Sequence, residues 1–144
     1  MRLTVYSDYS LRLLMYAALR PGELVTIQQV ADTYGISRNH LMKVAFELGR
    51  HGFLETVRGR GGGVRLARPA EQIGLGDVVR RTEEDFDMVE CFAADTDRCA
   101  VSGACRLKGA LSRALNAYLA VLDEYTLADL TRRNTPLARL LQPA

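Results

Sequence analysis

Residues 26–68 read TIQQVADTYGISRNHLMKVAFELGRHGFLETVRGRGGGVRLAR. Apolar residues recur at helical spacing in two segments of this stretch, 27–34 and 41–48. Ser37 can cap the second helix, and Gly35 lies in the short link between the two, where a residue with positive φ commonly ends a helix. Two short helices joined by a turn that contains glycine predict a helix-turn-helix motif.

A basic β-hairpin is predicted directly after this motif. Residues 53–57 and 64–67 are short runs rich in strand-forming side chains. The loop between them, residues 58–63, reads RGRGGG, and its glycines tolerate the positive φ angles of tight turns. A helix-turn-helix followed by a hairpin is the element order of a winged helix.

A helix before the motif and another after it complete the predicted domain. Ser7 is the expected N-cap of the first, and the helix is expected to end before Pro21. Residues 75–81 predict the other helix. The expected fold is therefore mainly α with a small β-hairpin, and residues 1–82 are expected to form a winged helix-turn-helix DNA-binding domain. The predicted inner stripe of the first helix is Leu11, Leu14, Met15, Ala18 and Leu19.

Ten residues are candidate DNA contacts. Arginine and asparagine in the first turn of a recognition helix can bond guanine and adenine bidentately. Basic residues further along this helix suit phosphates, and arginines in the hairpin loop suit the minor groove or the backbone beside it. Peptide N–H groups at the start of the preceding helix can bind another phosphate. The candidates are Thr26, Gln28, Ser37, Arg38, Asn39, His40, Lys43, Arg50, Arg58 and Arg60.

The composition agrees with a DNA-binding protein. The chain has 144 residues, of which 48% are hydrophobic and 25% charged, as in ordinary globular proteins. Residues 1–70 carry a net charge of +5 and residues 71–144 a net charge of −3, so the first half suits an anionic partner such as double-stranded DNA. No apolar run approaches the roughly 20 residues of a membrane span and no export signal is visible, so we expect a cytoplasmic protein without a membrane partner.

Three cysteines, Cys91, Cys99 and Cys105, lie in an acidic segment, residues 83–105. An odd number argues against a disulfide framework, and the spacing is wider than the paired cysteines of a zinc ribbon. A loop around an iron–sulfur cluster fits better, although three thiolates leave one of the usual four ligand positions open. Nearby carboxylates are candidates for that position. A zinc-stabilised regulator and an electron carrier are alternatives, although a carrier needs no basic recognition surface.

Residues 106–125 predict a long helix with an apolar stripe at heptad spacing, formed by Leu111, Leu115, Tyr118, Leu122 and Tyr125. We interpret it as a dimerisation helix, because it follows a complete small domain; packing within its own chain is the alternative. Residues 127–133 predict a last short helix, and Pro136 is expected to begin an irregular tail. The dimerisation helix and C-terminal segment thus span residues 106–144.

Several motifs in this order resemble the iron–sulfur winged-helix regulators of the Rrf-type family. They are MRLT at residues 1–4, YSDY at 6–9, LMKV at 41–44, GRGGGVRLA at 59–67, IGLGDVVR at 73–80, and the three cysteines, the last within GACRL at 103–107.

The resemblance implies a homodimeric repressor that senses nitric oxide. It implies that Cys91, Cys99 and Cys105 bind a 4Fe–4S cluster (alternatively 2Fe–2S), with Asp8 of the partner subunit as the fourth ligand. Nitric oxide would release the repressor from palindromic operator DNA and derepress nitric-oxide detoxification genes.

The chain departs from one branch of the family, which places a histidine three residues after the last cysteine, because that residue is Lys108 here. A general iron–sulfur or redox-responsive regulator is the alternative function. Catalysis is not expected, because the two histidines, His40 and His51, both lie in the DNA-facing part and leave no credible catalytic pair.

Overall fold

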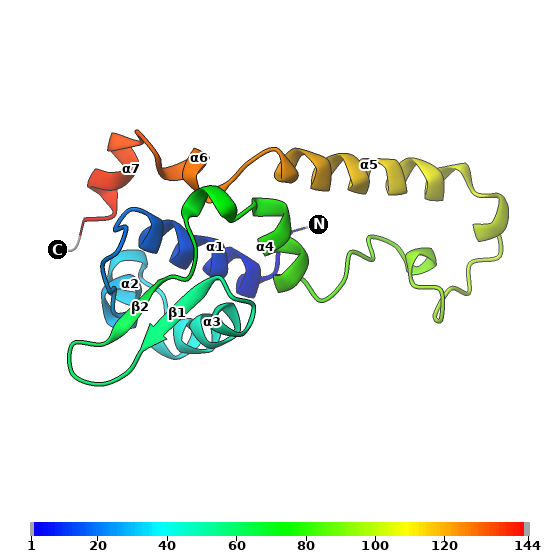
Figure 1. Ribbon diagram of the computed structural model, residues 1–144. Helices are drawn as coiled ribbons and strands as arrows, with labels where there is room; N and C mark the ends of the chain where they lie inside the picture. The colour runs from blue at the N-terminus through cyan, green and yellow to red at the C-terminus, as the bar shows by residue number, and fades with distance from the viewer. Residues whose placement is uncertain (1, 143–144) are drawn as a thin grey trace.

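The computed structural model describes residues 2–142, so Met1, Pro143 and Ala144, at the ends of the predicted segments 1–82 and 106–144, lie outside the described residues. The order of elements confirms the predicted winged helix (Figure 1). The helices and strands are α1 (Val5–Ala18), α2 (Ile27–Tyr34), α3 (Arg38–Arg50), β1 (Leu54–Val57), β2 (Gly63–Leu66), α4 (Leu75–Thr82), α5 (Arg106–Asp123), α6 (Leu127–Thr131) and α7 (Thr135–Leu140), with short 3-10 turns η1 (Ala70–Gln72), η2 (Glu90–Phe92) and η3 (Ser102–Ala104).

The helix-turn-helix forms from local signals. Thr26 and Gln29 make a capping box at the start of α2, and Gly35 ends this helix in the left-handed conformation, with φ 64°. Ser37 occupies the N-cap position of α3 without a side-chain hydrogen bond. The inner face of α3 is the predicted one, because its buried residues are Leu41, Val44, Ala45 and Leu48.

The wing is a two-stranded antiparallel sheet in which Leu54 pairs with Leu66 and Val57 with Gly63. Val64 also exchanges backbone hydrogen bonds with Val25, at 2.9 and 2.8 Å, which joins the wing to the segment before α2. The hairpin loop projects from the domain beside α2 and α3 (Figure 1). The hairpin loop therefore extends from a sheet whose base is hydrogen-bonded to the rest of the domain.

The start of α1 differs from the prediction. Its N-cap is Thr4, whose side chain accepts a hydrogen bond from the Ser7 N–H, so the assignment of Ser7 as the cap is wrong. Ser7 is fully buried and donates to Thr82 Oγ1 at 2.8 Å, while the Thr4 N–H donates to Glu83 at 2.9 Å. No local sequence signal indicates that the end of α4 lies beside this turn.

The inner stripe of α1 is also wider than predicted. Of the five residues in that stripe only Leu14 is buried, whereas Leu13, Tyr16 and Ala17 are buried as well. The cause is position, because α1 is contacted by α3, α4, α6 and β2. A helix at the centre of a domain buries more than one stripe.

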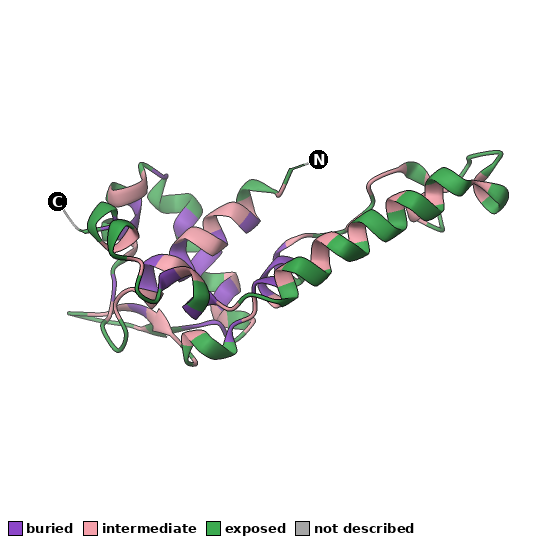
Figure 2. Cartoon of the chain, turned by 90° about the horizontal axis from the view of Figure 1, so that it is seen from above, coloured by how far each residue is buried: buried purple, intermediate pink, exposed green. Residues whose placement is uncertain are grey.

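Helix α5 projects away from the winged-helix domain (Figures 1 and 2). None of the residues in Arg106–Asp123 is buried, and Leu107 and Val121 are 65% and 52% exposed. Its C-terminal end is anchored, because Arg80 of α4 makes a bidentate ion pair with Asp123, at 2.6 and 2.7 Å, and the Leu75 N–H donates to the Tyr125 carbonyl at 2.9 Å.

The chain returns to the winged-helix domain after α5. Leu127 and Leu141 are buried in the same core as α1 and α3, so this end of the predicted segment 106–144 packs on the domain rather than on α5. Pro136 begins no irregular tail, which corrects the prediction, because it lies in the first turn of α7. Proline is well suited to that position, where its missing N–H costs no hydrogen bond. Among residues 2–142, no helix has the length and apolar character to cross a membrane.

Candidate DNA-binding face and cysteine loop

All ten predicted DNA contacts have exposed side chains on the winged-helix domain. Those of α3 stand at its start and along its outer face, and two more, Arg58 and Arg60, lie in the wing loop. Three have side-chain hydrogen bonds or ion pairs with neighbouring residues: Thr26 caps α2, Gln28 donates to Asp32 at 2.7 Å, and Arg50 pairs with Glu47 at 3.0 Å. The pairing of Arg50 is exposed and thus weak enough to exchange for a phosphate.

The wing loop depends on a close approach of its backbone. Gly59 and Gly61 adopt positive φ angles of 98° and 74°. A Cβ atom added at Gly62 would stand 2.2 Å from the Val57 carbonyl oxygen, a backbone atom. The loop that carries Arg58 and Arg60 therefore has no room for a side chain at position 62.

We expect Gly62→Ala to destabilise the fold by about 1–3 kcal/mol, because the loop must shift to admit the methyl group. DNA affinity should fall with it. Urea unfolding measures the first effect and fluorescence anisotropy on duplex DNA the second. Gly103→Ala is the matched control, since an added Cβ at Gly103 meets nothing within 4 Å. Equal stability of the two variants would contradict the steric argument.

Asp8 lies in the first turn of α1, inside a small network that reaches α3. Both of its carboxylate oxygens bind Arg12, one turn later, at 3.0 and 2.8 Å. The Arg12 guanidinium lies 5.9 Å from the ring centre of Tyr9 and 5.8 Å from that of Tyr34, within the range of cation–π attraction. The Tyr9 ring in turn packs against His40 of α3, with ring centres 6.3 Å apart.

Burial raises the pKa of Tyr34 to about 12, and the positive charge of Arg12 opposes this shift more weakly. Tyr34 is therefore neutral near pH 7, and its hydroxyl donates to the Arg12 carbonyl at 3.2 Å. The end of α2 is thereby held against α1. Sequence analysis did not single out Arg12, Tyr9 or Tyr34 for this role; the four-residue spacing of Asp8 and Arg12, which favours ion pairs on a helix, was the available signal.

The three cysteines are free thiols in the predicted segment 83–105, where the only helical turns are η2 and η3. Cys91 lies in η2, Cys99 is exposed, and Cys105 is the N-cap of α5, where its sulfur accepts the Lys108 N–H at 3.4 Å. The single chain does not bring them together, because no group of three metal-binding side chains occurs among residues 2–142.

Two of the acidic residues in this segment organise the loop. Asp97 accepts the Cys99 N–H at 3.0 Å and pairs with Lys108 of α5 at 3.7 Å. Hydrogen bonds from Ser102 and from the Cys99 N–H hold the pKa of Asp97 below its usual value. Glu90 accepts the Arg98 N–H at 3.0 Å. These two carboxylates, at least, have partners within the loop.

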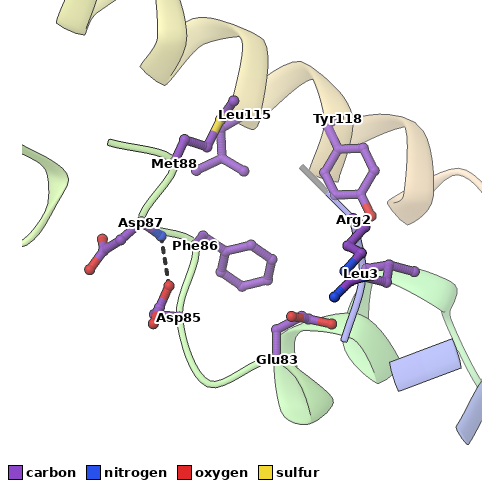
Figure 3. A pocket seen from close by; sticks show the side chains of 9 residues that line it. All are labelled: Arg2, Leu3, Glu83, Asp85, Phe86, Asp87, Met88, Leu115 and Tyr118. Atoms are coloured by element: carbon purple, nitrogen blue, oxygen red, sulfur yellow. Dashed lines mark hydrogen bonds between the residues drawn. The ribbon is translucent and has the colours of Figure 1, made fainter. Parts of the chain in front are cut away.

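A hollow of about 520 Å³ lies where the N-terminal segment, the acidic segment and α5 meet (Figure 3). Phe86 and Met88 line it together with Leu115 and Tyr118 from the stripe of α5. Burial, and next the charge of Glu83, raise the pKa of Tyr118. Part of the α5 stripe, Leu115 and Tyr118, therefore faces its own chain.

The donor set suits an iron–sulfur cluster in its chemistry. All three thiols are at least partly exposed, and the α5 dipole favours a thiolate at Cys105. The segment lacks a buried core of its own, since none of its residues from 83 to 105 is buried, so it can close around a group at modest cost. Arranging the thiols around a cluster requires such a closure.

Comparisons with known proteins show the family to which the chain belongs. The Rrf2 family model, described as an iron-dependent transcriptional regulator, matches residues 3–133. An HTH-type transcriptional regulator NsrR of Bacillus subtilis is 56% identical over 143 residues, which cover 99% of this chain and 98% of that protein. The protein of the same name from Shouchella clausii is 53% identical, covering 99% of this chain and 96% of that protein.

Solved structures show the same fold. The global cysteine regulator CymR of B. subtilis superposes with a TM-score of 0.74 at 23% identity, covering 91% of this chain and 96% of that chain. Because the full-length relatives are transcriptional regulators, this protein is a transcriptional regulator and not an enzyme. The chain belongs to the Rrf2 family of iron-dependent transcriptional regulators.

Proposed function

We propose that the protein is a cytoplasmic homodimeric repressor that holds an iron–sulfur cluster and leaves its operator in response to nitric oxide. Residues 1–82 bind palindromic DNA, residues 83–105 hold the cluster, and α5 joins two subunits. The genes that it releases from repression would be those of nitric-oxide detoxification. The observation that carries the proposal is the set of three free, accessible thiols in a loop between a DNA-binding domain and an exposed helix.

Cys91, Cys99 and Cys105 would hold the cluster, with Asp8 of the partner subunit as the fourth ligand, and 4Fe–4S is the proposed type. Bound iron would supply a site that nitric oxide can attack. A carboxylate is a weaker partner for iron–sulfur iron than a thiolate, so Asp8 is the ligand that we expect to be lost first.

The chain's own contacts explain how loss of Asp8 reaches DNA. In the single chain Arg12 holds both carboxylate oxygens of Asp8. Coordination to a metal ion would withdraw charge from these oxygens and would change their geometry, so it would weaken the ion pair with Arg12. Arg12 also contacts Tyr9, and Tyr9 packs on His40 at the start of α3. Movement of Asp8 from one partner to the other therefore shifts the packing behind the recognition helix.

A second connection runs through the ends of α1 and α4. Ser7 and Thr82 share a buried hydrogen bond, and Thr4 binds Glu83, the first residue of the cysteine segment. Rearrangement of this segment thus pulls on the turn that carries Asp8. A dimer must present its recognition helices about 34 Å apart, or a multiple of it, and a small rotation of each domain disturbs that spacing.

The test is Asp8→Ala in protein purified without oxygen. We expect the variant still to bind iron. The ratio of its operator affinities without and with nitric oxide should fall by at least about tenfold, the effect of one lost charged contact in a site. Iron and acid-labile sulfide per chain, and anisotropy on operator DNA, measure the two effects. Glu124→Ala, at an exposed carboxylate that follows α5 and lies away from the proposed DNA contacts, is the control.

Full cluster-dependent affinity and full nitric-oxide response in Asp8→Ala would contradict the proposed role of this residue. Zinc or no metal in the wild-type protein would remove the sensor part and leave the DNA-binding part. Equal release by oxygen, peroxide and nitric oxide would favour the general redox-responsive regulator.

A further inference from the structure

Two large apolar side chains stand on the outer face of α3, among the residues expected to meet DNA. Phe46 is 65% exposed and Met42 is 47% exposed. They lie one turn apart, and with Tyr6 of α1 they line a shallow hollow of about 530 Å³, edged by Lys43 and Glu47. Contacts with phosphates and polar base edges alone would not bury these two apolar side chains.

These residues belong to one row along the helix. Arg38, Met42, Phe46 and Arg50 follow one another at intervals of four, so their side chains lie along one ridge. All four are exposed. The row therefore has a positive charge at each end and an apolar centre.

The dimensions of this row suit the major groove. Arg38 and Arg50 are twelve residues apart, or about 18 Å along the helix axis at 1.5 Å per residue. The groove is about 12 Å wide, so a row of this length spans it, with Arg38 at the base edges and Arg50 within reach of a phosphate. The apolar centre then lies over the base edges, where the thymine 5-methyl group is the apolar group that DNA presents.

We propose that Phe46, with Met42, contacts thymine methyl groups in the major groove and sets the operator preference of the protein. The occupant of the apolar hollow is thus DNA, as indicated by its continuity with the basic recognition face. The inference rests on the DNA-binding part of the proposed function and is independent of the iron–sulfur and nitric-oxide parts.

The test begins with selection of binding sites from random duplexes by the full-length protein, purified without oxygen. The selected sites should contain thymine at defined positions in each half-site. Replacing such a thymine by deoxyuridine removes only the methyl group. We expect wild-type affinity to fall about fourfold for each contacted methyl, the equivalent of exposing one buried CH₂ group.

A double-mutant cycle connects this loss to the side chain. The deoxyuridine substitution should change the affinity of Phe46→Ala by less than about 1.5-fold, whereas Phe46→Leu, which stays apolar, should retain at least half of the methyl effect. Because Phe46 is exposed, both variants should fold, which circular dichroism checks. Leu140→Ala, at a 78% exposed apolar residue of α7, is the control and should respond like the wild type.

An equal deoxyuridine effect in Phe46→Ala and in the wild type would overturn the proposal, and so would selected sites without a preferred thymine. Weakened self-association of Phe46→Ala with an unchanged methyl effect would assign the apolar face to a protein interface instead. Absence of nitric-oxide response in the wild type would count against the proposed sensor and leave this result untouched.

Discussion

Cys105→Ser is expected to lose nearly all bound iron and to reduce operator affinity by about 10³-fold, toward the level of non-specific DNA binding. Serine has no thiolate to give to iron, and its hydroxyl stays protonated near pH 7. At the same time serine is a better helix N-cap than cysteine. Because the Cys105 sulfur caps α5 by accepting the Lys108 N–H, the substitution removes the proposed ligand while preserving the start of the helix.

The comparison that separates chemistry from folding is Cys105→Ala. This variant should lose iron to the same extent, but it also loses the cap, at a cost of about 1 kcal/mol in stability. Metal-free Cys105→Ser should unfold in urea within about 0.5 kcal/mol of the metal-free wild type. Full iron content and wild-type operator affinity in Cys105→Ser would exclude Cys105 from the site.

The recognition half of the molecule could be predicted because its signals are local. The capping box at Thr26, the left-handed Gly35 and the helical spacing of apolar residues in α3 each act within a few residues. The glycine-rich loop likewise reports its own turn geometry. Such local features are sufficient to predict that the ten candidate DNA contacts lie on the surface, without knowledge of long-range packing.

Long-range packing is what the sequence left undecided. The cap of α1 lies at Thr4 rather than Ser7 because Ser7 is buried against Thr82, 75 residues later. Pro136 begins a helix rather than a tail, and Leu141 beyond it completes the core of the winged-helix domain. A proline fits both the first turn of a helix and an irregular segment, so the contact partner decides between them.

The candidate metal site was predictable in its residue types and not in its geometry. Clustering in sequence identified the three cysteines, but one chain does not bring them together. The network from Asp8 through Arg12 and Tyr9 to His40 crosses from α1 to α3. Only the spacing of its first two members is a local signal.

Val121→Asp is expected to convert the protein from dimer to monomer and to weaken operator binding by 10²–10⁴-fold. Val121 lies at the edge of the apolar stripe of α5, next to Leu122, and is 52% exposed in the single chain, so its replacement should leave the monomer folded. An aspartate there would place an unpaired charge in the proposed interface. A dimer that binds two half-sites at once has an affinity about 10²–10⁴-fold higher than a single subunit on one half-site, and a monomer loses this advantage.

Ala120→Asp is the matched control, because it places the same charge on the opposite, exposed face of α5 and should remain dimeric. Sedimentation measures the assembly and anisotropy the affinity. A dimeric Val121→Asp with wild-type affinity would assign the stripe to packing within its own chain. The large expected effect follows from the anchoring of α5. The Arg80–Asp123 ion pair and the hydrogen bond from the Leu75 N–H to the Tyr125 carbonyl join its end to α4. Pairing of two α5 helices would therefore restrict the relative position of the two recognition helices.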